Sequence, residues 1–219
     1  MARKTKEEAE RTRKTLIHAA LMHFSEHGVA HTTLNDISKA AGVTKGAFYW
    51  HFKNKLEIFE AIVEAYSQPL DEQATNMLEQ AAEPLSGLFQ SLAYYASEVE
   101  KSPELIALFT VSFYKCEYTR ELTPLLKFDQ QEVAKTKEII TTALKKLPDN
   151  GWQNNQEGNP ELIATIAIDA VTGTLMRWCR DRQGSLSGQI LDAAKIVLSG
   201  SGIRPALLEQ AAASINLAQ

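Results

Sequence analysis

The chain has 219 residues, is 44% hydrophobic and carries a net charge of −4, so it can bury a large core in one or two domains. Its two cysteines, Cys116 and Cys179, are too few and too far apart for a disulfide framework or a zinc site. The N-terminus has no signal-peptide pattern, and the longest apolar run, Leu162–Ile168, is far short of the ~20 residues that span a bilayer. We therefore expect a cytoplasmic protein with no membrane, metal or cofactor.

Charge is divided unequally along the chain. Residues 1–55 hold ten basic and five acidic side chains, a net charge of +5, which leaves −9 for the remainder. All five histidines also lie in the first 51 residues. These charges could belong to an ordinary solvated surface. A basic N-terminal segment on an acidic body is also typical of a chain whose first part binds the phosphates of a nucleic acid.

The first predicted helix covers about residues 7–26. Ile17, Ala20, Leu21 and Phe24 form one apolar stripe, and Gly28 ends the helix. The length of this helix exceeds what a turn motif needs, so we expect it to brace the elements that follow.

Residues 32–52 (TTLNDISKAAGVTKGAFYWHF) predict two short helices around a tight turn. Thr33 and Asp36 have the spacing of a capping box, Gly42 suits a turn that needs positive φ, and Thr44 suits the cap of the second helix. This pattern is that of a helix-turn-helix, whose second helix enters the DNA major groove.

The second short helix carries the side chains suited to DNA. Lys45 can donate to guanine, Tyr49 and His51 can donate to phosphate, and Gly46 is small enough to allow close approach. Lys55 begins the next helix, where the N-terminus attracts phosphate. The basic arm Arg3, Lys4 and Lys6 is either a further contact or a solvated tail. The predicted DNA-binding residues are Thr33, Thr44, Lys45, Gly46, Tyr49, Trp50, His51 and Lys55.

Signals for the start of a helix recur along the rest of the chain, after residue 54. Asn54 and Glu57 suggest a second capping box, and several later starts are marked by a proline. The expected helices lie near 84–101, 103–118, 124–147, 160–182, 187–199 (capped by Ser187) and 206–217, with a polar loop at 148–158. No strand alternation is present, so the predicted fold class is all-α.

Two further clusters lie in the body. The helix near 103–118 and its expected neighbours carry aromatic and methionine side chains, which suit either a plain core or a pocket for a bulky apolar or cationic compound. The candidate ligand-binding residues are Phe89, Leu92, Phe109, Phe113, Tyr114, Gln130, Val171, Thr172, Met176 and Trp178. The last two long helices carry faces suited to a four-helix dimer interface. These faces consist of Ile163, Ile166, Ala167, Ala170, Gly173, Thr174, Ile190, Leu191, Ala194, Val197 and Leu198.

The segment GVTKGAFYWHFKNKLEIF resembles the signature of the TetR family of transcriptional repressors. The first 38 residues and the segment FYKCEY at 113–118 resemble the AcrR-type repressors of multidrug efflux pumps. The resemblance implies an N-terminal three-helix DNA-binding domain over residues 1–54 and a C-terminal helical ligand-binding and dimerisation domain over 55–219, with about nine or ten helices in all. Close relatives tend to carry arginine at the position of Lys45, so base discrimination there is expected to be looser.

The resulting hypothesis is a homodimeric repressor that reads a pseudo-palindromic DNA operator and leaves it when a small lipophilic ligand binds. The ligand could be drug-like, phenolic, fatty-acid-like or a signalling lactone, and the protein could also activate some promoters. An adaptor that binds another protein is the alternative from a different class. No constellation of catalytic residues is found, so we do not expect an enzyme.

Overall fold

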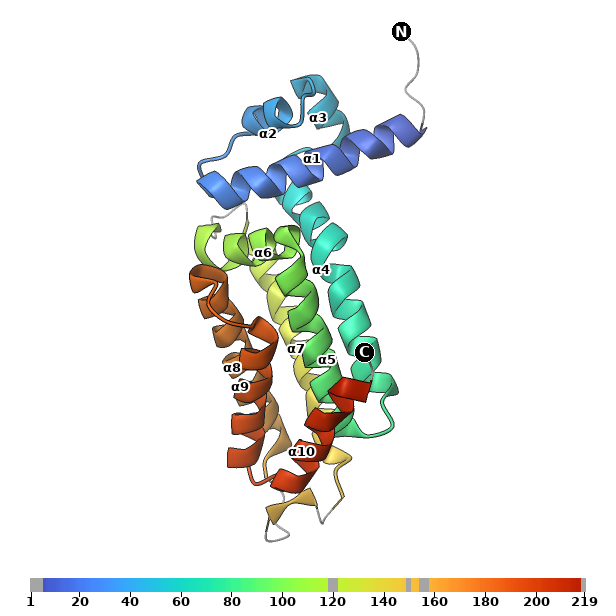
Figure 1. The fold of residues 1–219 in the computed structure, drawn as a ribbon. Helices are drawn as coiled ribbons and strands as arrows, with labels where there is room; N and C mark the ends of the chain where they lie inside the picture. Colours follow the sequence, from blue (N-terminus) through green and yellow to red (C-terminus); the bar gives the residue numbers. More distant parts are fainter. Residues whose placement is uncertain (1–5, 118–121, 149–150, 154–157, 218–219) are drawn as a thin grey trace. The chain divides into compact units, whose positions relative to one another are not determined.

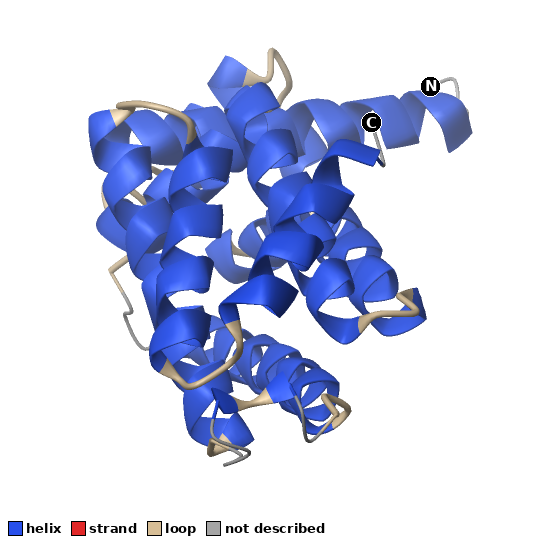
Figure 2. Ribbon diagram, turned by 60° about the horizontal axis from the view of Figure 1, so that its bottom comes forward, coloured by secondary structure: helices blue, strands red, loops and turns tan. Residues whose placement is uncertain are grey.

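The computed structural model describes residues 6–117, 122–148, 151–153 and 158–217, with the backbone alone at 125–129, 216 and 217. Those residues form helices (Figures 1 and 2) and one isolated β-bridge, between Trp152 and Ile203. The predicted all-α class, with nine or ten helices, is confirmed for the described part. The α-helices are α1 (Lys6–His27), α2 (Leu34–Ala40), α3 (Lys45–His51), α4 (Lys55–Gln80), α5 (Pro84–Lys101), α6 (Pro103–Thr110), α7 (Thr123–Lys145), α8 (Pro160–Asp181), α9 (Leu186–Gly200) and α10 (Pro205–Ala213).

The chain divides into two compact units. The first contains residues 1–69 and 103–128, and the second contains residues 70–102 and 129–219. The division falls inside α4, directly after Pro69, the proline in that helix. A proline in a helix interior removes one main-chain hydrogen bond and favours a kink. The domain boundary expected between residues 54 and 55 stays a prediction.

The core of the first unit is built around the stripe predicted on α1. Ile17, Ala20, Leu21 and Phe24 are at most 2% exposed. Phe48 of α3 belongs to the same cluster as side chains from α2, α4 and α6. The long first helix therefore braces the helix-turn-helix, as expected, because its apolar face supplies one side of the shared core.

The second unit has its own core. α8 and α9 run side by side (Figure 1), and α5 packs against α9 and α10. Trp152 is 3% exposed in this core, although the sequence predicted a polar loop at 148–158. Its neighbours on the chain pair with the segment after α9: Gln153 N donates to Gly202 O at 2.7 Å. Residues 149–150 and 154–157 of the predicted loop lie outside the described residues.

Several helix ends differ from the prediction by one to a few residues. α6 ends at Thr110 and continues as a π-helical turn, η1 (Val111–Lys115), so the regular helix is shorter than the expected 103–118. α9 begins at Leu186, because Ser185 rather than Ser187 caps it by accepting from Gly188 N. α7 covers Thr123–Lys145, so it begins one residue before the expected 124 and ends two residues before the expected 147.

α8 is long and apolar enough to cross a membrane by length and composition alone. The core helix of a soluble protein meets the same criteria, so this is weak support for a span. In the structure Ile163 and Ala164 of α8 are buried in the core of the second unit. Polar residues interrupt the apolar runs of this helix, so the length of its longest apolar run does not mark it as a possible span.

Candidate nucleic-acid interface

The start of α2 forms the capping box that the sequence predicted. The Thr33 hydroxyl oxygen accepts from Asp36 N at 3.2 Å, and Asp36 Oδ2 accepts from Thr33 N at 3.0 Å. The Thr33 hydroxyl also donates to Asp36 Oδ2 at 2.5 Å. The two hydrogen bonds from Thr33 lower the pKa of the Asp36 carboxyl below its ordinary value. Thr33 is therefore occupied in fixing the first turn of α2.

The turn between α2 and α3 also follows the prediction. Gly42 has a φ of +66°, a conformation that glycine adopts at little cost. The Thr44 hydroxyl oxygen accepts from Ala47 N at 3.1 Å and caps α3. Phe48 and Phe52 are 0% and 3% exposed, so they point into the core. These contacts leave the opposite face of α3 toward solvent.

That opposite face gathers several of the residues predicted to bind DNA. Tyr49 is 49% exposed and Trp50 is 72% exposed, and Lys45 and Gly46 are also exposed. The ring of His51 is half-buried and meets the Trp50 ring edge-on, with 4.6 Å between centroids. The exposed side of α3 thus offers the cation of Lys45, the hydroxyl of Tyr49 and the large ring of Trp50, with the His51 ring beside Trp50.

Lys55 has contacts that sequence reasoning missed. Its ammonium donates to Val29 O at 2.8 Å and to Ala30 O at 3.2 Å, both in the loop that joins α1 to α2. At the same helix start, Asn54 Oδ1 accepts from Glu57 N at 2.9 Å, as predicted. The Glu57 carboxylate accepts from Lys53 N rather than from Asn54 N, one residue away from the expected capping box.

The predicted ligand-binding residues are distributed over both units. In the first unit Phe109 and Phe113 stack with 5.9 Å between centroids, and Phe113 meets Tyr114 edge-on at 6.3 Å. In the second unit two of them are buried in the core and five are half-buried or exposed. The buried pair is Phe89 and Trp178, and the others are Leu92, Gln130, Val171, Thr172 and Met176. Their role in ligand binding stays a prediction.

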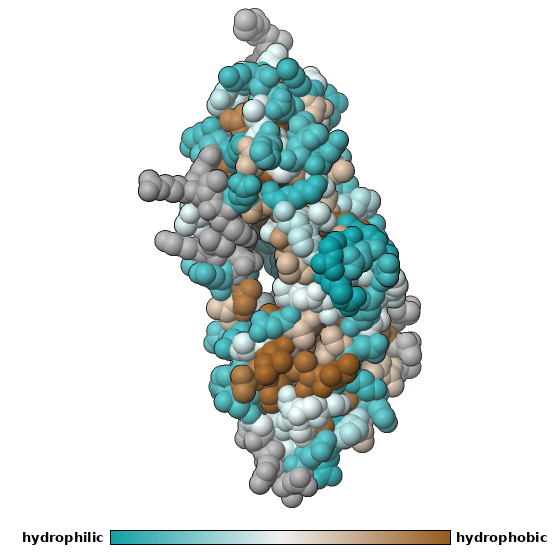
Figure 3. Space-filling view, turned by 90° about the vertical axis from the view of Figure 1, so that its left-hand side faces the viewer, coloured by the Kyte–Doolittle hydropathy of each residue, from teal (hydrophilic) through white to brown (hydrophobic). Residues whose placement is uncertain are grey.

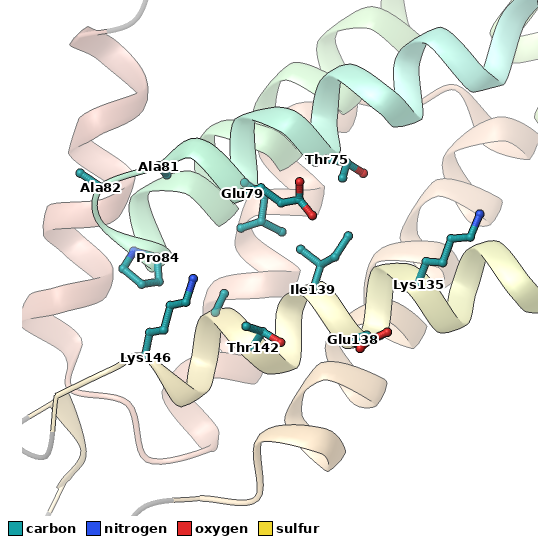
Figure 4. A pocket seen from close by; sticks show the side chains of 12 residues that line it. Thr75, Glu79, Ala81, Ala82, Pro84, Lys135, Glu138, Ile139, Thr142 and Lys146 are labelled. Carbon is teal, nitrogen blue, oxygen red and sulfur yellow. The ribbon is translucent and has the colours of Figure 1, made fainter.

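A groove of about 760 Å³ lies in the second unit between the end of α4 and α7 (Figure 4). Its floor is apolar, with Leu78 and Ile139 among the lining residues, and Lys135 and Lys146 stand along the α7 side. A groove of this size can hold a drug-sized molecule. None of the predicted ligand-binding residues lines it, and no sequence pattern singled it out.

The predicted dimerisation faces are partly used within the second unit itself. Ile163 and Ala167 of α8 are 4% and 6% exposed, and three predicted residues of α9 are at most 1% exposed. Those three are Ile190, Ala194 and Leu198. The apolar side chains left exposed on these helices are Leu162, Ile166, Met176 and Ile196. Figure 3 shows a hydrophobic patch on the side of this unit that carries α8 and α9.

Comparison with known proteins agrees with this helix-turn-helix geometry. The sequence model described as "Bacterial regulatory proteins, tetR family" matches residues 16–62. The HTH-type transcriptional regulator TtgR of Pseudomonas putida is 34% identical over 179 residues, which cover 81% of this chain and 85% of TtgR. This relative is a transcriptional regulator.

Solved structures extend the likeness to nearly the whole chain. NalD of Pseudomonas aeruginosa, the secondary repressor of the MexAB-OprM multidrug efflux pump, matches with a TM-score of 0.78 and 27% identity, over 91% of this chain and 100% of NalD. A complex of SmeT with triclosan matches with a TM-score of 0.75 and 26% identity, over 89% of this chain and 93% of SmeT. The chain therefore belongs to the tetR family of bacterial regulatory proteins and is a DNA-binding transcriptional repressor.

Proposed function

We propose that this protein is a cytoplasmic homodimer that represses a multidrug efflux operon and leaves its operator when a small lipophilic compound binds. The exposed face of α3, with Lys45, Tyr49 and Trp50, carries the DNA-binding half of the proposal. The efflux half is supported by relatives, because NalD represses MexAB-OprM and SmeT of Stenotrophomonas maltophilia represses the multidrug efflux pump SmeDEF.

Two copies of α3 would enter successive major grooves roughly 34–36 Å apart, so the operator would be pseudo-palindromic. Lys45 at the start of α3 would read a guanine, whereas Tyr49 and His51 would donate to phosphates and set the register. The Lys55 ammonium has three N–H donors, two of which donate to the carbonyls of Val29 and Ala30. A phosphate contact from Lys55 would use the third. Arg3 and Lys4 of the predicted basic arm lie outside the described residues.

The dimer would form through the exposed apolar side chains of α8 and α9. Leu162, Ile166 and Met176 lie on one face of α8, and Ile196 of α9 is 72% exposed. A Cβ added at Gly173, on the same α8 face, would meet nothing within 4 Å in this chain. Packing within the chain therefore does not demand glycine there. Small residues allow two helices to approach closely, which suits a partner helix laid across this face.

The ligand would be a small lipophilic compound, drug-like, phenolic or fatty-acid-like. The SmeT–triclosan complex shows that a structurally similar protein takes up a phenolic compound. In this chain the half-buried Phe109 and Phe113 and the exposed Tyr114 offer aromatic surface for such a compound. For the ligand to release DNA, it must bind the DNA-free form more tightly than the DNA-bound form.

Fluorescence anisotropy with DNA from the region upstream of the gene, against scrambled DNA at fixed salt, tests the proposal. Preferential binding that triclosan, a lipophilic cation or a fatty acid abolishes is the expected result. Preferential binding that no compound changes would refute ligand release and retain the DNA-binding role. If the protein prefers no upstream sequence over scrambled DNA, operator recognition is refuted and the alternative, an adaptor that binds another protein, is favoured.

A further inference from the structure

A lysine that is distant in sequence closes the C-terminal end of α1. The Lys115 ammonium donates to Ser25 O at 2.5 Å and to Glu26 O at 3.1 Å. The last carbonyls of a helix have no partner within the helix, and a cation near them is favourable. Lys115 also accepts through its own carbonyl from Val29 N at 3.0 Å. Three hydrogen bonds therefore join Lys115 to the junction between α1 and α2.

The loop that follows this junction is held from a second side. Lys55, at the start of α4, donates to the carbonyls of Val29 and Ala30. The buried Thr32 donates from its hydroxyl to Gly28 O at 2.8 Å. Thr33, the next residue, is the cap of α2. The position at which the helix-turn-helix begins is thus set by side chains from α4 and from the π-helical turn η1.

The π-helical turn that ends in Lys115 also carries aromatic surface. Val111 of this turn is 0% exposed and anchors it in the core of the first unit. Phe113 stacks on Phe109, and Tyr114 is 41% exposed. π-helical turns are rare and are found frequently at functional sites. A compound that packs against Phe113 or Tyr114 would therefore act within two residues of Lys115.

We propose that Lys115 couples ligand contact on η1 to the position of the helix-turn-helix. A compound that displaces η1 withdraws the Lys115 ammonium from the carbonyls of Ser25 and Glu26, and the start of α2 loses one of its two supports. Lys115 is a positioning residue, because it acts through the α1–α2 loop and not on DNA. The inference rests on the proposed function and adds a connection through η1 to the contacts that Lys55 of α4 makes with the same loop.

The test compares operator affinity with and without saturating triclosan in four proteins: wild type, Lys115→Met, Lys115→Arg and Lys101→Met. Met keeps the length of the side chain but removes its donors, whereas Arg keeps donors and charge. Lys101 is an exposed lysine of α5 that pairs with Glu98, so its substitution controls for the loss of one positive charge. Triclosan affinity of the free proteins and their Tm are measured alongside, because a purely structural defect would change these values.

Wild type is expected to lose roughly 5–150-fold in operator affinity with triclosan, the usual range of allosteric coupling. In Lys115→Met this ratio should fall to about twofold or less, with triclosan affinity unchanged, while Lys115→Arg and Lys101→Met keep the wild-type ratio. If triclosan lowers the operator affinity of wild type and of Lys115→Met by the same factor, the inference is overturned and the proposed function stands. If triclosan, a lipophilic cation and a fatty acid all fail to release the wild-type protein from its operator, the proposed function and the inference are overturned together.

Amide hydrogen exchange without any ligand gives a second readout. If Lys115 supports the loop, exchange of the Gly28–Thr33 amides should be at least several-fold faster in Lys115→Met and unchanged in Lys101→Met. Lys115→Gln, which keeps one donor group, should lie between wild type and Lys115→Met. Equal protection of these amides in all the proteins would show that Lys115 does not position the loop, and would overturn the inference.

Discussion

The ammonium of Lys45 lies 5.8 Å from the centroid of the Tyr49 ring on the exposed face of α3. The two residues are four apart in one helix, so their side chains are neighbours. A cation over an aromatic face is stabilised by about 0.5–1 kcal/mol at an exposed site. The ring of Tyr49 therefore restricts where the Lys45 ammonium lies before DNA arrives, and the two side chains are expected to act at adjacent points of the operator.

Lys45→Ala is expected to weaken specific binding by about 1–3 kcal/mol and to relax the preference at one base position, because the donor to guanine is lost. Anisotropy with a set of operators, each changed at one base pair, measures both effects. Lys39→Ala, which removes an exposed lysine of α2, is the control and should leave every base preference unchanged. An unaltered preference in Lys45→Ala would refute the base contact.

Tyr49→Phe is expected to weaken binding to operator and scrambled DNA by a similar factor. The substitution removes only the hydroxyl, so the ring stays beside Lys45 while the phosphate contact is lost. The slope of log affinity against log salt should not change, because a neutral hydroxyl releases no counterions. A loss confined to particular base substitutions would show instead that Tyr49 takes part in reading sequence.

The capping box predicts a specific dependence of stability on pH. The hydroxyl and N–H of Thr33 hydrogen-bond the Asp36 carboxylate and lower its pKa below the ordinary 3.8. A carboxyl group whose pKa is lowered by folding stabilises the fold above the unfolded pKa, and this contribution is lost as pH falls through the folded value. The difference in unfolding free energy between wild type and Asp36→Asn should therefore be constant near neutral pH and shrink below about pH 4.

Carbon-13 NMR titration of the Asp36 carboxyl group gives the direct check. Thr33→Ala removes the hydroxyl, which is the largest cause of the shift, so the Asp36 pKa should move back toward its ordinary value. A carboxyl group that titrates at the same pH in both proteins would contradict the role of Thr33.

The sequence predicted the helix-turn-helix because its signals are local. Thr33, Gly42 and Thr44 each act on main-chain groups within three residues, and such contacts can be inferred from spacing alone. The same holds for Asn159, whose side chain caps α8 by accepting from Leu162 N. The cap of α9 lies two residues before the predicted one because Ser185 and Ser187 carry the same local signal.

The contacts that the sequence did not predict join distant residues. Lys55 reaches Val29 across 26 positions, and Lys115 reaches Ser25 across 90. Trp152 is buried because its segment pairs with the residues after α9, a partner that composition does not reveal. Lysine side chains are mostly exposed, and a tryptophan flanked by polar residues gives no local sign of the core that buries it. Only the three-dimensional arrangement therefore identifies these contacts.

Ile166→Glu is expected to convert the dimer to monomer, because it places a charge on the exposed apolar face of α8. Val133→Glu is a matched control: Val133 lies on α7 and is 44% exposed, against 45% for Ile166. Sedimentation velocity measures the oligomeric state, and anisotropy measures the weaker operator binding that follows when the two recognition helices are no longer joined. Ile196→Glu should behave like Ile166→Glu. A dimer that survives both substitutions would exclude this face as the interface.

Phe113→Ala and Ala143→Trp distinguish two sites for the ligand. Phe113 belongs to the predicted aromatic set, whereas Ala143 lines the groove between α4 and α7, where an indole would fill the space. We expect Phe113→Ala to weaken triclosan binding roughly tenfold, equivalent to about 1.4 kcal/mol, and Ala143→Trp to leave it unchanged. Calorimetric titration measures the affinity, with Tm as the check that each variant is folded. The reverse pattern would assign the ligand to the groove, and with it remove the reason for a compound to act directly on η1.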